Sequence, residues 1–209
     1  DPYSASKAAA ENIIYSYIKS YFNKKNSNIS ISIARAGNVI GGGDWSEDRI
    51  IPDCIKSWSK NKIAVIRNPN STRPWQHVLE AVGGYLILAS KLNKNKKLHG
   101  QAFNFGPNNS NNFKVNDLIK KMQNYWSGIR WKKSKKIKKN LFESKLLQLN
   151  SSKAKKILNW NSILKFDETI ELVTSWYKNF YLNRNLIKKN SLNQITFYEK
   201  SLKERLKIK

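Results

Sequence analysis

The segment "ISISIARAGNVIGGGDW" (residues 29–45) decides the fold class of this chain. Its first half alternates isoleucine with small or polar residues, which is the period of a β-strand. Its second half breaks that pattern with three consecutive glycines, which is typical of a loop. The preceding residues, 4–22, place apolar side chains at the spacing of an amphipathic helix. A helix, a strand and a glycine loop in this order predict an α/β fold.

Helices and strands keep alternating along the rest of the chain, which favours helices layered around a parallel sheet. Two basic stretches interrupt the alternation: an exposed excursion at 127–140 and a basic C-terminal tail at 183–209. The other expected elements are helices within 51–61, 79–93, 113–126, 151–160 and 166–181, strands within 63–68, 101–107 and 145–149, and a short extended piece within 68–78.

The net charge of +25 over 209 residues raises the question of a polyanionic partner. The excess is mostly lysine, it is spread over several expected helices, and no helix-turn-helix, zinc-finger or RNA-binding motif accompanies it. We therefore interpret the lysines as solvated helix faces, with no nucleic acid favoured as a partner. A basic remnant that binds polyanions is the non-enzymatic alternative.

The cysteine and histidine content and the hydropathy argue against disulfides, metal sites and membrane-spanning segments. Cys54 is the single cysteine, so an internal disulfide and a thiolate metal site are excluded, and we expect a small buried residue in a reducing cytoplasm. His77 and His99 lack metal-ligand spacing, and we interpret His77 as a packing residue. No apolar run approaches the roughly 18 residues that span a bilayer.

Tyr3 and Lys7 form a Y-x-x-x-K pair at the start of the first expected helix. Positions i and i+4 share one helix face, so a phenol and an ammonium there can reach the same ligand. A phenol is a poor base at neutral pH, but a neighbouring cation favours its ionised form, and a lysine can donate to ribose hydroxyls. The pair suits proton removal from a sugar alcohol while hydride leaves its carbon.

Four stretches follow one another at suitable spacing: "DPYSASKAAAE", "ARAGNVIGGGDWSEDRIIPDCI", "IRNPNSTRPWQHVLEAVGGYLILA" and "FNFGP". In this order they resemble the extended short-chain dehydrogenase/reductase family, and more closely its CDP-glucose 4,6-dehydratases. The resemblance covers nearly the whole chain from the Y-x-x-x-K pair onward. It implies the C-terminal part of a Rossmann-like parallel sheet and a smaller mixed α/β lobe that binds the substrate.

The resemblance implies a role for each matching residue. Tyr3 is the active-site base and Lys7 its partner on the nicotinamide ribose of NAD; both contact the cofactor. Asn38 contacts the phosphates of the nucleotide sugar, and Arg73 binds its pyrophosphate. Read without the resemblance, Asn38 caps a turn and Arg73 pairs with a surface carboxylate. The glycines 41–43 either let the backbone approach a ligand or form a turn.

The implied reaction converts CDP-glucose to CDP-4-keto-6-deoxyglucose on the route to a cell-surface (O-antigen) sugar, in a homo-oligomeric enzyme. No glycine-rich dinucleotide loop occurs in the 209 residues. We therefore expect a C-terminal fragment that lacks the N-terminal dinucleotide-binding half, is inactive alone and is marginally stable, unless a separate polypeptide completes it. A related UDP- or GDP-sugar epimerase or dehydratase is the enzymatic alternative.

Overall fold

The first helix, α1 (Pro2–Tyr17), begins two residues before the expected range, because Pro2 stands at its start and Asp1 caps it. The Asp1 carboxylate accepts a hydrogen bond from the Ser4 N–H at 3.0 Å. A short π-helical turn (Ile18–Phe22) extends it. The computed structural model describes residues 1–22, 27–107, 112–134 and 148–206.

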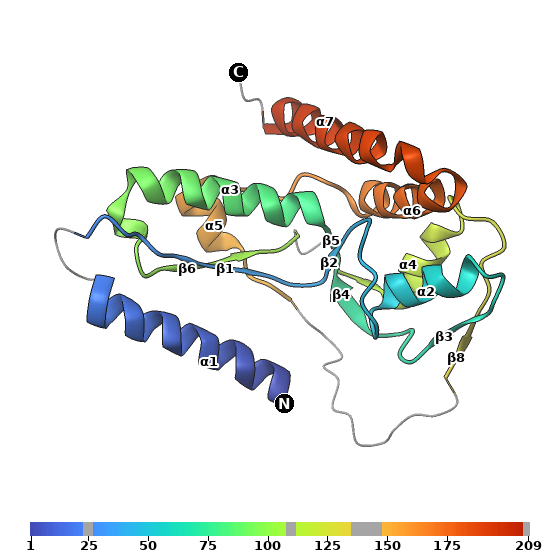
Figure 1. The fold of residues 1–209 in the computed structure, drawn as a ribbon, viewed down its shortest axis with the longest axis horizontal. Coiled ribbons are helices and arrows are strands. Elements are labelled where there is room, and N and C mark those ends of the chain that lie inside the picture. The colour runs from blue at the N-terminus through green and yellow to red at the C-terminus, as the bar shows by residue number, and fades with distance from the viewer. Residues whose placement is uncertain (23–26, 108–111, 135–147, 207–209) are drawn as a thin grey trace.

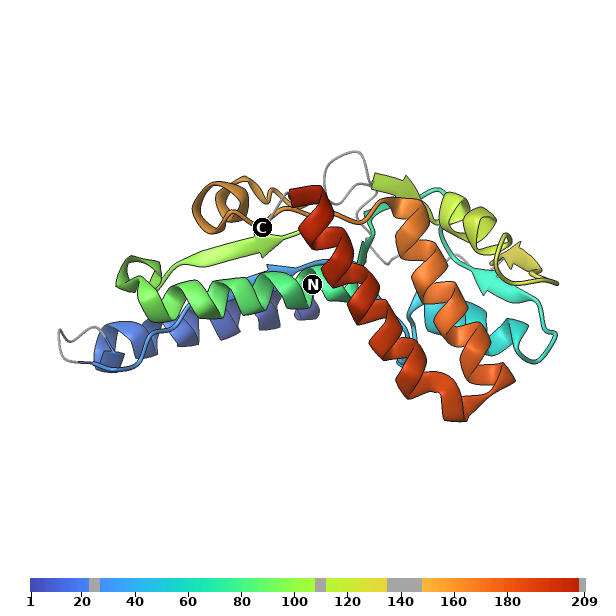
Figure 2. The same cartoon turned by 90° about the horizontal axis from the view of Figure 1, so that it is seen from above.

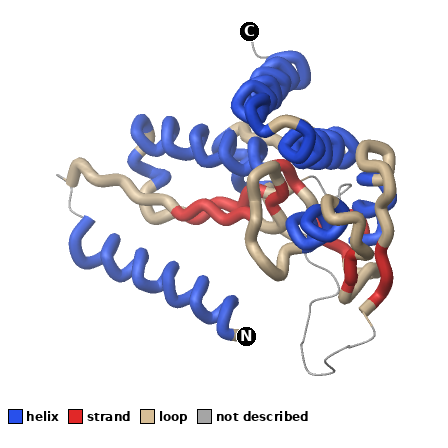
Figure 3. Tube along the Cα trace, turned by 45° about the vertical axis from the view of Figure 1, so that its right-hand side comes forward, coloured by secondary structure: helices blue, strands red, loops and turns tan. Residues whose placement is uncertain are grey.

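The expected parallel sheet takes the form of short strand pairs. The longest pair, β1 (Ile33–Ala36) with β6 (Ala102–Phe105), is parallel and runs between α1 on one side and α3 (Val78–Lys94) on the other (Figure 1). Figure 3 shows these strands at the centre with helices around them. Three further pairs occur: parallel β2 (Val39–Ile40) with β5 (Gln76–His77), parallel β3 (Ala64–Ile66) with β8 (Trp131–Lys133), and antiparallel β4 (Thr72–Pro74) with β7 (Asn112–Lys114).

Two main hydrophobic clusters divide the molecule into two lobes, which lie at opposite ends of its long axis (Figure 2). The α2 lobe contains α2 (Ile50–Trp58), α4 (Val115–Met122) and α6 (Phe166–Leu182). The α3 lobe packs α3 and β6 against α5 (Ser152–Leu158). Its core residues are Leu88, Leu98, Phe103, Phe105, Ala154, Leu158 and Trp160.

Close packing explains some of the glycines. A β-carbon on Gly42 would lie 2.1 Å from the ring of Trp176, and one on Gly84 would lie 2.3 Å from the ring of Phe105. Gly43 has a φ of +85°, which other residues rarely adopt. At these positions the glycines are therefore needed by packing and by the turn.

The C-terminal segment differs most from the sequence expectation. Residues 187–206 form a 20-residue helix, α7 (Ile187–Leu206), where the sequence predicts a basic and weakly periodic tail. The residues that α7 buries most fully are Gln194, Tyr198 and Ser201, and its partly buried Leu202 and Leu206 pack against the cluster that contains Tyr198. The packed face of this helix thus mixes polar with apolar residues, which makes the period weak in the sequence; the helix packs beside α6 (Figure 1).

The basic excursion expected at 127–140 is also partly regular. Its residues Trp131–Lys133 form β8, and the Trp58 indole donates a hydrogen bond to the Arg130 carbonyl at 2.9 Å. None of residues 127–134 is buried, as expected of an exposed stretch, but the sequence does not predict the strand at 131–133; 135–140 lie outside the described residues. The strand expected within 145–149 falls partly outside them too, and 148–150 are not in a strand.

Candidate functional site

A cleft of about 610 Å³ lies where α2 and β3 face the β2 and β4 region. Its walls include Asn38 and Gly41 beside β2, Asp53 on α2, and Arg73 on β4. The volume falls within the range of small-molecule sites. The structure therefore brings Asn38 and Arg73, which the resemblance assigned to the phosphates, to the same cleft.

Asn38 occupies the turn between β1 and β2 in the left-handed conformation, with a φ of 52°. Asparagine tolerates this conformation better than most residues. Within the described part of the chain, its buried Oδ1 has no hydrogen-bond partner. Gln76 stabilises the turn: its Nε2 donates to the carbonyl of Gly37 at 3.3 Å and to that of Phe105 at 2.8 Å. Asn38 thus lies in a well-supported turn and lines the cleft.

Arg73 is half-buried on β4, where its Nη1 donates to the Thr72 carbonyl at 2.8 Å. The antiparallel register pairs Arg73 with Phe113 of β7. Next to it, the Trp75 indole donates to the Phe113 carbonyl at 3.0 Å, and the Trp75 ring is buried. These contacts hold the strand that carries the guanidinium in the cleft wall.

Tyr3 and Lys7 lie on α1, outside the lining of this cleft. Both side chains are exposed, Tyr3 to 67%, and the Lys7 ammonium lies 5.5 Å from the centroid of the Tyr3 ring. The pair therefore shares one helix face, as its spacing predicts. In Figure 1 the N-terminal end of α1 points away from the β1–β6 pair.

An ion pair links α1 to β1. The Arg35 Nε donates to the Glu11 carboxylate at 2.6 Å, and a second guanidinium nitrogen contacts the other oxygen. The guanidinium holds the pKa of the Glu11 carboxyl below its usual range. This bidentate contact fixes the orientation of the helix that carries Tyr3 and Lys7.

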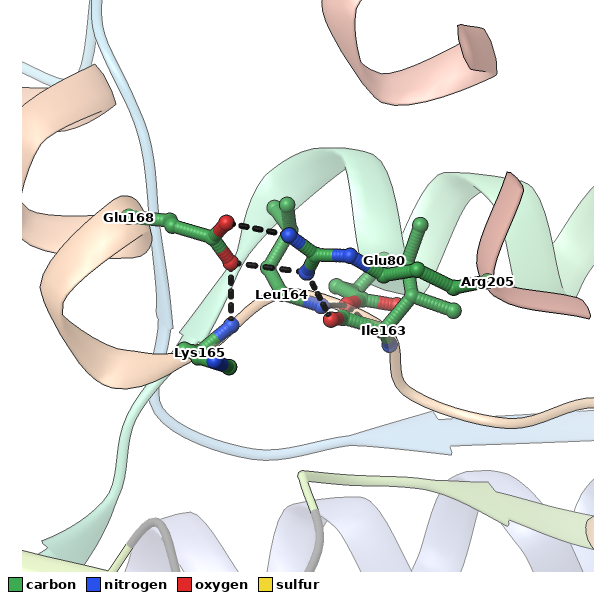
Figure 4. Close-up of polar contacts among 6 residues, drawn as sticks. All are labelled: Glu80, Ile163, Leu164, Lys165, Glu168 and Arg205. Atoms are coloured by element: carbon green, nitrogen blue, oxygen red, sulfur yellow. Dashed lines mark hydrogen bonds and ion pairs between the residues drawn. The ribbon is translucent and has the colours of Figure 1, made fainter. Parts of the chain in front are cut away.

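Outside the cleft lining, a buried carboxylate that the sequence did not single out anchors α3. Glu80 accepts hydrogen bonds from the N–H groups of Ile163 at 2.7 Å and Leu164 at 2.6 Å, as well as from Ser162 and Tyr198 (Figure 4). Burial raises the pKa of the Glu80 carboxyl, and the donated hydrogen bonds oppose that shift.

A side chain of α7 also contacts this turn, residues 162–165. The Arg205 guanidinium donates to the Ile163 carbonyl at 2.6 Å and pairs with Glu168 at the start of α6 (Figure 4). The 162–165 turn therefore ties α3, α6 and α7 together. No metal centre accompanies this cluster: the described residues contain no group of three His, Cys, Asp or Glu that could hold a metal ion. Nor do they contain a helix that is long and apolar enough to cross a membrane.

Comparison with known sequences identifies relatives of this arrangement. Residues 1–173 match the model of the family described as GDP-mannose 4,6 dehydratase. The CDP-glucose 4,6-dehydratase of Salmonella typhimurium is 37% identical over 182 residues, which cover 85% of this chain and 50% of that enzyme. The dTDP-D-glucose 4,6-dehydratase of Dictyostelium discoideum is 34% identical over 92 residues, or 44% of this chain and 20% of that enzyme.

Solved structures share the fold. UDP-glucuronic acid 4-epimerase from Bacillus cereus, solved with UDP-glucuronic acid and NAD, has a TM-score of 0.70 at 21% identity, over 87% of this chain and 54% of its own. The dTDP-glucose 4,6-dehydratase from Bacillus anthracis, solved with NAD, has a TM-score of 0.67 at 19% identity, over 91% and 55%. The chain spans about half the length of these two structures and of the Salmonella relative. It belongs to the GDP-mannose 4,6-dehydratase family, among the nucleotide-sugar 4,6-dehydratases of the epimerase/dehydratase group.

Proposed function

We propose that this chain supplies the nucleotide-sugar cleft and the Tyr–Lys pair of an NAD-dependent CDP-glucose 4,6-dehydratase, a hydro-lyase. The observation that carries the proposal is that Asn38 and Arg73, from separate elements, line one cleft of about 610 Å³. The 37% identity to the Salmonella CDP-glucose enzyme supports the choice of sugar nucleotide. The product is CDP-4-keto-6-deoxyglucose.

In this proposal Arg73 holds the diphosphate. A guanidinium presents donors in a planar fork that matches two phosphate oxygens, and the half-buried position strengthens such a contact. The Asn38 amide reaches the same diphosphate from the β1–β2 turn. Both residues act by orienting the substrate, which places the sugar relative to the reacting groups.

Tyr3 and Lys7 fit the nicotinamide-ribose end of NAD, because both side chains are exposed on one face of α1 and lie close to each other. Lys7 donates hydrogen bonds to ribose hydroxyls, and the Tyr3 phenolate removes the proton of the sugar C4 hydroxyl. When bound, NAD would take up the C4 hydride, which acidifies the C5 proton, and would return that hydride to C6 after water has left across C5 and C6, so that the cofactor ends in its starting oxidation state.

Calorimetric titration of CDP-glucose into the chain tests the assignment, with Arg73→Lys as the variant. A lysine keeps the charge but not the fork, so we expect affinity to fall about tenfold, the value of one charge-assisted hydrogen bond. Arg130→Lys is the matched control, since Arg130 donates to the Asn61 carbonyl outside the cleft lining, and it should bind like the parent. Equal affinity of the parent and Arg73→Lys for CDP-glucose would refute the proposal that the Arg73 guanidinium holds the diphosphate.

A further inference from the structure

One wall of the cleft is an apolar strip that ends in a guanidinium. Residues 63–68, which include β3, all line the cleft. Among them Ala64 and Ile66 are buried, whereas Ile63 is 45% and Val65 56% exposed, so the latter two side chains are open to a ligand. Arg67 pairs with Asp48 at 3.5 Å, and both partners are well exposed.

A carboxylate on α2 lies on the same cleft. Asp53 is in the first turn of α2, directly after Pro52, and lines the cavity. Among the residues that the structure describes, none is seen to donate a hydrogen bond to its carboxylate. Burial raises the pKa of the Asp53 carboxyl, and the charges of Lys56 and Arg67 oppose that shift. Asp53 is exposed at the cleft and close enough to Arg67 for the guanidinium charge to act on its carboxyl.

This combination matches the shape and polarity of a pyrimidine base. The flat faces of the base suit an apolar strip such as Ile63 and Val65, and its O2 atom, which all pyrimidines share, accepts a hydrogen bond of the kind Arg67 donates. At C4, cytosine carries an amine that donates, whereas uracil and thymine carry an oxygen that accepts. An ionised carboxylate only accepts, so it attracts the amine and repels the oxygen.

We propose that Asp53 and Arg67 read the edge of the nucleobase and that Asp53 selects a pyrimidine with an exocyclic amine. This inference rests on the proposed function, which places a nucleoside diphosphate in the cleft. It adds the residue that discriminates CDP-sugars from UDP- and dTDP-sugars. Arg73 and Asn38 contact the diphosphate, which all these substrates share, so they cannot supply that discrimination.

The test measures CDP, UDP and inorganic pyrophosphate binding to the chain and to Asp53→Asn by calorimetry. The parent should bind CDP at least about tenfold tighter than UDP, because a polar site that pairs with one base leaves its groups unpaired against the other. The Asp53→Asn amide can accept from the amine or donate to the oxygen, so the CDP-to-UDP ratio should fall to about one. Pyrophosphate binding should not change.

Asp167→Asn is the matched control. It makes the same change in the first turn of α6, where Asp167 pairs with Lys121 outside the cleft lining, and should leave the base preference intact. Equal binding of CDP and UDP by the parent, with pyrophosphate still bound, would overturn the inference but not the proposed function. If the parent binds neither nucleotide nor pyrophosphate, both fail. If Asp53→Asn also loses pyrophosphate binding, its effect is not base-specific and the inference fails.

Discussion

His77 should make the stability of this protein depend on pH in a defined window. The side chain is 1% exposed, and its Nδ1 accepts a hydrogen bond from the Leu79 N–H at 3.3 Å, capping α3. The proton of the neutral ring is thus on Nε2, which is buried with no partner among the described residues. Protonating Nδ1 would remove the cap and put a cation at the positive end of a helix. Burial lowers the pKa of His77 from 6.5 to about 4.

The sign and size of the effect follow from that pKa. Between pH 6.5 and pH 4 the unfolded chain binds the proton and the folded chain does not, so the free energy of unfolding falls as the pH falls. The contribution of His77 is fully present above pH 6.5 and is lost by pH 4. At about 1.4 kcal/mol for each pH unit, the loss is about 3 kcal/mol.

Urea unfolding followed by circular dichroism at pH 7, 5.5 and 4 measures the effect, with His77→Asn as the variant. Asparagine retains an acceptor that can cap α3 but does not titrate, so its stability should depend less on pH than that of the parent. His99→Asn, at the other histidine and outside the core, is the control and should keep the parent's dependence. Parallel curves for the parent and His77→Asn would refute the reasoning.

Two stability predictions concern packing and buried polar groups, and both are read from urea or thermal unfolding. Glu80→Ala leaves two buried N–H groups of the 163–164 turn without an acceptor and should cost about 3 kcal/mol, whereas Glu80→Gln, which keeps an acceptor oxygen, should cost less. An equal loss for both variants would contradict the role of the carboxylate. Gly84→Ala places a β-carbon 2.3 Å from the Phe105 ring and should cost about 1–3 kcal/mol; an unchanged melting temperature would contradict the close approach.

The sequence predicts the helices whose apolar residues follow a clear period. α3, α4 and α6 lie within a few residues of the expected ranges, because burying an apolar stripe is what stabilises them. α7 shows only weakly in the sequence pattern, since its packed face mixes the polar Gln194 and Ser201 with apolar residues, and it is also held by hydrogen bonds to distant residues. β8 does not show, because pairing with β3, and not its own basic sequence, makes it a strand.

In the site, too, residues in local sequence motifs could be predicted, whereas residues placed by long-range packing could not. Asn38 and Arg73 stand in distinctive motifs, so the resemblance points to them from the sequence alone. Asp53 gives no comparable signal, because its place opposite β3 depends on how α2 packs. Glu80 binds backbone N–H groups more than 80 residues away, and a backbone donor leaves no mark in a sequence.

A crystal structure of the chain with CDP-glucose is the most direct test of the central claim, that this cleft holds the nucleotide sugar. The account predicts the diphosphate within hydrogen-bond distance of the Arg73 guanidinium and the Asn38 amide. It also predicts the cytosine against Val65, with its amine on the Asp53 carboxylate. A nucleotide bound elsewhere on the surface, or one whose phosphates contact neither Arg73 nor Asn38, would contradict the account.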